Sequence, residues 1–390
     1  MTHLSLVYGI VSASKGFKVI FYDNQKDIIE KFDKGIFSID EPGIKKFFSK
    51  YRGSLFFTSD IEEIKKSKIV FIAPDIETDS NGKSNLYKIN LLISMVLNHI
   101  ESKQLLIILS QVQPGFTRII SKKHSLTYYM VETLIFGEAM NRALYPERII
   151  IGKNNKDEKM DHYFLKYLYL FSKKIIEMNY ESAELTKISI NIFLATSITT
   201  TNYLSDIANQ VNANWNHIKE SLKLDKRIGK YAYLEPGLGI SGGNIERDLR
   251  GIQDISKKIK INQSLINSVK KYSSYYKDWP FRALNKINYQ NKKIGILGLT
   301  YKENTNSIKN SPSIKLINKM INTLKIKKDL IFVFDPKVKF IKNLKVNYLD
   351  NELNLLKSCK ILIIMTNWDI FKNLKLRDIV KNFDGNDIID

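Results

Sequence analysis

Short apolar runs alternate with amphipathic stretches along the first third of the chain. The apolar runs, rich in Val, Ile, Leu and Phe, span residues 17–22, 69–73 and 105–109. Runs this short and this apolar are typical of strands buried on both faces of a parallel sheet. The stretches with apolar residues at helical spacing are 4–14, 27–32, 60–65 and 86–98. This alternation predicts a doubly wound α/β domain.

The remainder of the chain predicts a helical middle followed by a second α/β unit. Residues 182–211 contain neither Gly nor Pro and carry apolar residues at helical spacing, which predicts one long spine helix. Strand-like runs then recur at 294–297, 330–334 and 360–365. The predicted fold is therefore α/β, with two Rossmann-like doubly wound domains joined by a central helical domain. The expected domains are 1–177, 178–282 and 283–390.

Both ends of the chain look incomplete at this stage. The chain enters a helical pattern within four residues of Met1, where a domain of this kind opens with a strand and a Gly-rich turn. Residues 387–390 resemble the interior of a strand. An incomplete gene model or fragment is the favoured explanation, and genuine loss of the first strand is the alternative. We expect residues 1–390 alone to be poorly soluble.

Composition narrows the class of protein. The longest apolar runs, 103–110 and 360–366, fall well short of the roughly 20 residues of a membrane span, and no signal-peptide pattern opens the chain. The single cysteine, Cys359, excludes an internal disulfide framework and a multi-cysteine metal site. We therefore expect a cytoplasmic protein with no membrane association and no metal.

The net charge of +21 raises the question of a nucleic-acid partner. The lysines, however, are spread along the whole chain among Asn and Ile, without a block of like charges. A compositional bias explains this pattern best, and a basic surface that attracts phosphorylated small molecules is the alternative. We expect no nucleic-acid binding.

Three groups of polar residues are candidates for chemistry. Asp23 follows an apolar run, where it can bind ribose hydroxyls or merely cap a helix. Lys187 and Asn191 share a helix face and can stabilise an oxyanion, although a solvated lysine would show the same spacing. Residues 237–243 contain four glycines, which allow a ligand close to the backbone. Asn244 and Asp248 would share a face if a helix begins there.

Seven sequence blocks extend this picture. They are Glu41-Pro42-Gly43, Ser110 to Thr117, Pro146 to Gly152, Ser182 to Thr196, Arg227-Ile228-Gly229, Leu297 to Thr305, and Lys309 to Pro312. In this order they resemble the motifs of the UDP-glucose/GDP-mannose dehydrogenase family over nearly the whole chain. The resemblance implies an NAD-dependent oxidation of a nucleotide sugar at C6, first to the aldehyde and then, through a cysteine thioester, to the uronic acid.

The resemblance also implies roles for individual residues. Lys187, Asn191 and Asp248 would hold water and stabilise the oxyanion, and Glu132 would contact substrate or assist thioester hydrolysis. The implied cofactor-side residues are Asp23, Gln111, Arg247 and Lys309. The implied substrate-binding residues are Tyr233, Leu234, Glu235, Pro236, Gly237, Lys302 and Arg227, the last from a neighbouring subunit. A homodimer or higher homo-oligomer through the long helix is also implied.

Several positions depart from the family pattern. Asn244 stands where the nucleophilic cysteine belongs, and a carboxamide cannot form a thioester. Thr2 and Ser5 stand at the second and third glycines of the dinucleotide turn, where a side chain crowds the pyrophosphate. Gln111 replaces a threonine, Arg247 replaces a lysine and Lys309 replaces an arginine. By resemblance Cys359 precedes the last strand of the third domain as a small core residue.

From these residues we expect a dehydrogenase that serves polysaccharide precursor synthesis and is limited to the first oxidation. A non-catalytic nucleotide-sugar-binding relative is the main alternative. A further alternative is a complete uronate-forming enzyme that uses another nucleophile.

Overall fold

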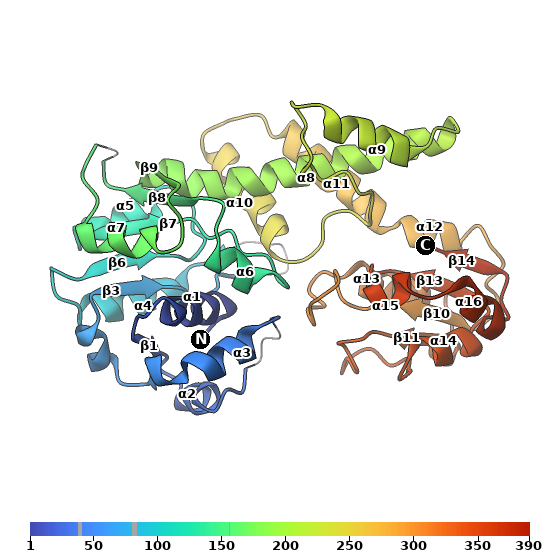
Figure 1. The fold of residues 1–390 in the computed structure, drawn as a ribbon. Helices are drawn as coiled ribbons and strands as arrows, with labels where there is room; N and C mark the ends of the chain where they lie inside the picture. The colour runs from blue at the N-terminus through green and yellow to red at the C-terminus, as the bar shows by residue number, and fades with distance from the viewer. Residues whose placement is uncertain (38–40, 80–83, 156) are drawn as a thin grey trace. The chain divides into compact units, whose positions relative to one another are not determined.

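The computed structural model describes residues 1–37, 41–79, 84–155 and 157–390 (Figure 1). The chain forms two compact units, residues 1–190 and 191–390. The prediction of an α/β fold with parallel sheets and a helical segment between them is confirmed. The boundaries of three separate domains stay a prediction.

The first unit is built on a five-stranded sheet. Its order is β3 (Ile69–Ile72), β6 (Leu105–Ile108), β7 (Thr127–Met130), β8 (Ile149–Lys153) and β9 (Ile175–Asn179), with only the β7–β8 pair antiparallel. All four residues of β6 are fully buried, because apolar side chains cover both faces of the sheet. The helices that accompany this sheet are α4 (Tyr87–Leu97), α5 (Phe116–Ser121), α6 (Ala139–Leu144) and α7 (His162–Tyr169).

A second, smaller sheet opens the same unit. β1 (Val19–Tyr22) pairs in parallel with β2 (Leu55–Thr58), and α1 (His3–Ser14), α2 (Lys26–Asp33) and α3 (Ile44–Tyr51) accompany the pair. Among the described residues β1 pairs only with β2, and β3 pairs only with β6 on its sheet. The short elements here are η1 (Arg52–Ser54), η2 (Ile61–Lys66), β4 (Glu77–Thr78) and β5 (Ser84–Asn85). The helix expected at 60–65 is therefore wrong in type: it is a 3₁₀ segment, capped by Asp60.

The spine helix is confirmed as α8 (Tyr180–Gln210), which is 31 residues long. It is followed by α9 (Trp215–Leu224), α10 (Asn244–Lys258), α11 (Ser264–Lys277) and α12 (Trp279–Leu284). Within the second unit, Ala195 of α8 packs with Leu249 of α10 and with Ile266 and Val269 of α11. This packing fixes the start of α10 against the spine helix.

The second unit ends in another parallel sheet. Its order is β12 (Asn347–Tyr348), β11 (Ile331–Phe334), β10 (Ile294–Leu297), β13 (Ile361–Ile364) and β14 (Asp387–Ile389). Its helices are α13 (Pro312–Asn322), η3 (Lys328–Leu330), α14 (Glu352–Ser358), α15 (Asp369–Lys372) and α16 (Leu376–Asn382). Cys359 precedes β13, and β14 follows, so the expectation that Cys359 precedes the last strand is wrong. Its expected place in the core is confirmed, since only 3% of the residue is exposed.

Within the described residues, no helix is both long enough and apolar enough to cross a membrane.

Candidate active site

Lys187 and Glu132 form a mostly buried ion pair in the first unit. Lys187 projects from α8, and Glu132 lies in the loop that follows β7, residues 131–138, termed the Glu132 loop below. The Lys187 ammonium lies 2.8 Å from Glu132 Oε1, with side-chain exposures of 9% and 13%. The other Glu132 oxygen accepts a hydrogen bond of 2.9 Å from the Leu134 backbone N–H. The alternative that Lys187 is an ordinary solvated lysine is therefore wrong.

Asn191 and Asp248 form the corresponding contact in the second unit. The Asn191 side-chain amide donates a hydrogen bond to Asp248 Oδ2, and both residues are buried. The remaining carboxylate oxygen lies 3.6 Å from Arg247 Nε. A carboxylate held in this way by an amide donor can accept a proton or orient a water molecule.

Asn244 is the first residue of α10, so the predicted helix start is confirmed. It is exposed and lies one turn before buried Asp248. The preceding glycines admit bulky neighbours: a Cβ on Gly242 would lie 2.8 Å from the Tyr301 ring, and one on Gly243 would lie 3.2 Å from the Lys309 side chain. Gly242 also has a φ of 87°, which other residues rarely adopt. The glycines thus allow the segment after β10 to contact the loop that leads to Asn244.

The proposed substrate segment 233–237 is held by side chains of the helical region. Thr201 donates a hydrogen bond to the Tyr233 carbonyl (2.8 Å), and Trp215 Nε1 donates one to the Leu234 carbonyl (3.0 Å). The Gly237 N–H donates to Asn202 Oδ1 (2.8 Å).

Glu235 pairs with Lys219 at 2.8 Å. Lys302 is half-buried after β10.

Arg227 is an exposed residue. Its side chain is 87% exposed and pairs with Asp225 at 2.7 Å. Within this chain it joins none of the contacts described above.

The carboxyl ends of β1 and β3 lie beside the first turn of α1. Asp23 directly follows β1, contacts the Met1 amino group and accepts a hydrogen bond from the Gln25 N–H (3.1 Å). Thr2 caps α1, accepts a bond from the Ser5 N–H (3.2 Å) and donates one to the Ala73 carbonyl (2.7 Å). The Ser5 hydroxyl accepts one from the Thr2 N–H (2.9 Å), which completes a capping box.

The residues around the first turn of α1 fit the ribose end of a dinucleotide, but they leave little room for its phosphates. Asp23 stands at the strand end where a carboxylate binds ribose hydroxyls, and a helix N-terminus adjoins it. Thr2 and Ser5, which the sequence prediction aligns with the glycines of the dinucleotide turn, are hydrogen-bonded to each other through their hydroxyls. Gln111, expected on the cofactor side, is buried shortly after β6.

Two structural carboxylates carry no assigned role in the sequence-based prediction. Glu184 is fully buried and accepts hydrogen bonds from the N–H groups of Gly115 (2.6 Å) and Thr117 (2.8 Å), which caps α5. Burial raises the pKa of Glu184 despite these bonds. Glu41 accepts hydrogen bonds from His3 and from the backbone N–H groups at the end of the Glu132 loop and the start of α6. Both residues belong to recognisable sequence blocks, but spacing alone could not reveal partners so distant in sequence.

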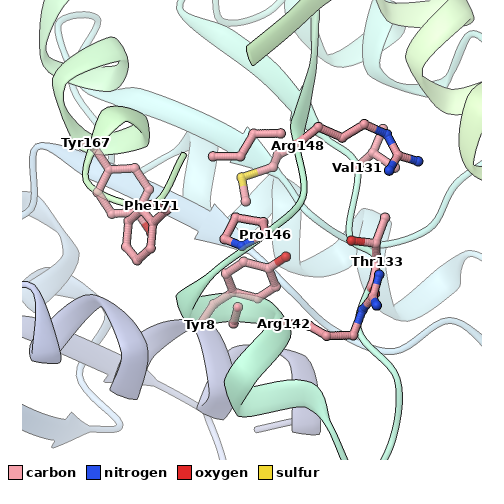
Figure 2. A pocket seen from close by; sticks show the side chains of 11 residues that line it. Tyr8, Val131, Thr133, Arg142, Pro146, Arg148, Tyr167 and Phe171 are labelled. Atoms are coloured by element: carbon pink, nitrogen blue, oxygen red, sulfur yellow. The ribbon is translucent and has the colours of Figure 1, made fainter. Parts of the chain in front are cut away.

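A small cavity lies behind the Glu132 loop. Tyr8, Thr133 and Arg142 are among its lining residues (Figure 2), and its volume of about 20 Å³ is room for one water molecule. Arg142 Nε donates a hydrogen bond of 2.9 Å to the Thr133 carbonyl. Burial, together with nearby Glu132, raises the pKa of Tyr8 well above its ordinary value. The cavity is too small for a nucleotide sugar, and its lining instead supports the loop.

Comparison with known proteins places this geometry in context. Three profiles of the UDP-glucose/GDP-mannose dehydrogenase family match: the NAD binding domain at residues 2–171, the central domain at 181–274 and the UDP binding domain at 295–390. A UDP-glucose 6-dehydrogenase from Rickettsia bellii is 29% identical, covering 97% of this chain and 91% of the relative. YwqF, a UDP-glucose 6-dehydrogenase from Bacillus subtilis, is 27% identical, covering 98% and 91%.

Solved structures share the fold. A UDP-glucose dehydrogenase from Pyrobaculum islandicum superposes with a TM-score of 0.85 at 24% identity, covering 96% of this chain and 90% of that one. A UDP-D-ManNAc dehydrogenase from Pyrococcus horikoshii gives 0.83 at 23% identity, covering 99% and 92%.

Proposed function

This chain belongs to the UDP-glucose/GDP-mannose dehydrogenase family, and we propose that it oxidises a UDP- or GDP-sugar at C6 to the aldehyde and stops there. The family's NAD-binding domain implies NAD as the cofactor, which accepts the hydride when bound. The observation that carries the proposal is the start of α10, where exposed Asn244 lies one turn before buried Asp248; by resemblance, Asn244 stands at the position of the nucleophilic cysteine.

The retained polar residues suffice for one oxidation. The C6 hydroxyl must lose a proton while its carbon loses a hydride. We assign Lys187 and Asn191, one turn apart on α8, to stabilise the developing alkoxide, and Asp248 to take the proton by way of a water molecule. Glu132 holds the Lys187 ammonium in place and contacts the substrate.

The second oxidation lacks its nucleophile. An aldehyde can lose a second hydride only after an oxygen-bearing adduct has formed, and in the family a thiolate forms it. The Asn244 carboxamide nitrogen is not nucleophilic because its lone pair is delocalised. We therefore propose an aldehyde product for polysaccharide precursor synthesis in the cytoplasm.

We assign ligand contacts by the same matching of motifs. Asp23, Gln111, Arg247 and Lys309 are assigned to the cofactor side. Residues 233–237 and Lys302 are assigned to the nucleotide sugar, with Arg227 acting from a neighbouring subunit. The exposed, separate position of Arg227 within one chain supports that last assignment.

A homo-oligomer is proposed from the spine helix. Phe193, Leu204 and Ile207 share one face of α8 by helical spacing, and their exposures are 78%, 40% and 42%. An apolar stripe of this kind marks an interaction surface. We propose that a second copy of the chain covers it.

One observation favours a second candidate, a nucleotide-sugar-binding protein without redox activity. The Thr2–Ser5 capping box places two side chains at the turn expected to receive the pyrophosphate. A chain of this kind would retain the UDP-binding domain and bind NAD weakly or not at all.

Calorimetric titration of NAD, with and without UDP-glucose, tests the proposal. Saturable NAD binding and one NADH per sugar oxidised are expected. Two NADH per sugar would contradict the single-step proposal and support a complete dehydrogenase with another nucleophile. Sugar binding without NAD binding would establish the second candidate instead.

A further inference from the structure

We infer that His3 and Glu41 are positioning residues that hold the Glu132 loop in the geometry needed for nucleotide-sugar binding. The inference rests on the proposed function, because that function assigns Glu132 to the substrate. Neither His3 nor Glu41 has a role in the chemistry assigned above.

Glu41 joins three separate segments of the first unit. Its side chain is fully buried. Oε2 accepts hydrogen bonds from His3 Nε2 (3.0 Å) and from the Gly137 N–H (3.1 Å), and Oε1 accepts one from the Ala139 N–H (2.8 Å). One carboxylate therefore connects the first turn of α1 to the end of the Glu132 loop and the start of α6.

The Glu41 carboxylate is suited to this role in its ionised form. Burial raises its pKa, but the hydrogen bonds from His3, Gly137 and Ala139 outweigh burial and hold the pKa below its ordinary value. An ionised carboxylate only accepts hydrogen bonds, so His3 Nε2 carries the proton in this pair. Charge-assisted bonds of this kind are stronger than those between neutral groups.

His3 also contacts the loop directly. Its ring stacks on Phe136, with centroids 4.4 Å apart and planes inclined by 25°. At the other end of the loop, Arg142 Nε holds the Thr133 carbonyl at 2.9 Å. The contacts of His3 and Arg142 thus hold the loop on both sides of the segment that follows Glu132. The Glu132 carboxylate itself pairs with the Lys187 ammonium.

The loop has few backbone contacts of its own. Residues 131–135 belong to no helix or strand, and a turn follows at 136–138. Side chains therefore contribute to where the loop lies: His3 and Glu41 hold its end, in addition to the contacts of Lys187 and Arg142. Because His3 lies in the same helical turn as Ser5, a movement of that turn would reach the loop through His3.

Hydrogen–deuterium exchange on the full chain, combined with UDP-glucose affinity, tests the inference. In Glu41→Gln we expect exchange at the Gly137 and Ala139 amides to rise at least about tenfold, and the sugar Kd to rise about tenfold. His3→Phe keeps the stacked ring and loses the donor, so it should change both readouts in the same direction. His3→Gln restores a donor and should recover most of the protection and the affinity.

Glu138→Gln is the matched control, because Glu138 is an exposed loop carboxylate without a side-chain capping bond. It should change neither readout. Exchange in Glu41→Gln equal to that in Glu138→Gln would overturn the inference. So would increased exchange with an unchanged sugar Kd, since the pair would then serve stability alone.

Two further outcomes are separable. If Glu41→Gln does not fold, the contrast between His3→Phe and His3→Gln decides the question. If the unmodified chain binds no nucleotide sugar, the proposed function is wrong, and so is the positioning role that rests on it. The exchange data then show only whether His3 and Glu41 hold the loop.

Discussion

At the residue scale, we expect the residue at position 244 to decide between one oxidation and two. Asn244→Cys would place a thiol at a helix N-terminus, which lowers its pKa and favours the thiolate. We expect this variant to gain the second oxidation and to form two NADH per sugar instead of one.

Asn244→Ala is the control for that experiment, because it removes the carboxamide without supplying a nucleophile. It should remain at one NADH per sugar. If Asn244→Cys also remains at one, then α10 does not present residue 244 to the aldehyde, and the assignment of this position is wrong.

Cys359 offers a second test at this scale. Burial raises its pKa to about 12, so the thiolate is disfavoured at neutral and mildly alkaline pH. We expect the folded chain to show no reaction with a thiol reagent at pH 8. Unfolding should restore reactivity, because the thiol pKa returns to about 8.5.

Cys359→Ala checks that this residue is structural. The thiol contacts the Leu356 carbonyl within the core of the last sheet. The free energy of unfolding of the variant should fall by about 1 kcal/mol. Its NAD-linked activity should stay unchanged. Loss of activity in a variant of unchanged fold would give Cys359 a role that this location does not explain.

At the element scale, we expect the first turn of α1 to limit cofactor affinity. The Thr2 and Ser5 side chains of the capping box accept hydrogen bonds from N–H groups that would otherwise be free to donate to a pyrophosphate. A double variant, Thr2→Gly with Ser5→Gly, should bind NAD about tenfold more tightly, which is about 1.4 kcal/mol. It should also unfold more easily, because glycine costs a few tenths of a kcal/mol at the N-cap position of Thr2 and roughly 0.5–1 kcal/mol within the helix at Ser5.

Ser14→Gly is a suitable control at the opposite end of α1. The Ser14 hydroxyl donates a hydrogen bond to the Val11 carbonyl, so NAD affinity should not change in this variant. Equal NAD affinity in the double variant and the unmodified chain would mean that these side chains do not limit binding.

At the scale of the whole molecule, the exposed face of α8 predicts self-association. Ile207→Asp places a charge at the C-terminal end of the stripe defined by Phe193, Leu204 and Ile207, and burying that charge in an interface is costly. The dimer dissociation constant should rise at least about tenfold in sedimentation experiments. Leu376→Asp, an equally drastic change at an exposed leucine of α16, should leave it unchanged.

A monomeric unmodified chain at micromolar concentration would contradict the proposed interface. A dimer that persists equally in Ile207→Asp and Leu376→Asp would place the interface elsewhere.

The sequence alone was sufficient to predict most of the elements and to propose residues for chemistry. Runs such as 294–297 became strands because apolar, β-branched residues in short stretches have few alternatives to a buried sheet. The absence of Gly and Pro from 182–211 was enough to predict α8. Lys187, Asn191 and Asp248 were found because helical periodicity and family motifs are local properties of a chain. The type of helix at 60–65 was harder to predict, because six residues that begin with Asp can form a 3₁₀ segment as well as an α-helix.

Only the tertiary structure decided which of these groups meet. Glu132 and Lys187 pair across 55 positions of sequence, as do Asn191 and Asp248 across 57, and no spacing rule predicts such contacts. The same is true of Glu41, whose three donors come from both sides of it in the chain. Pairing at a distance depends on how the sheet and helices pack, because packing brings remote side chains within hydrogen-bond reach and removes the water that would otherwise solvate them.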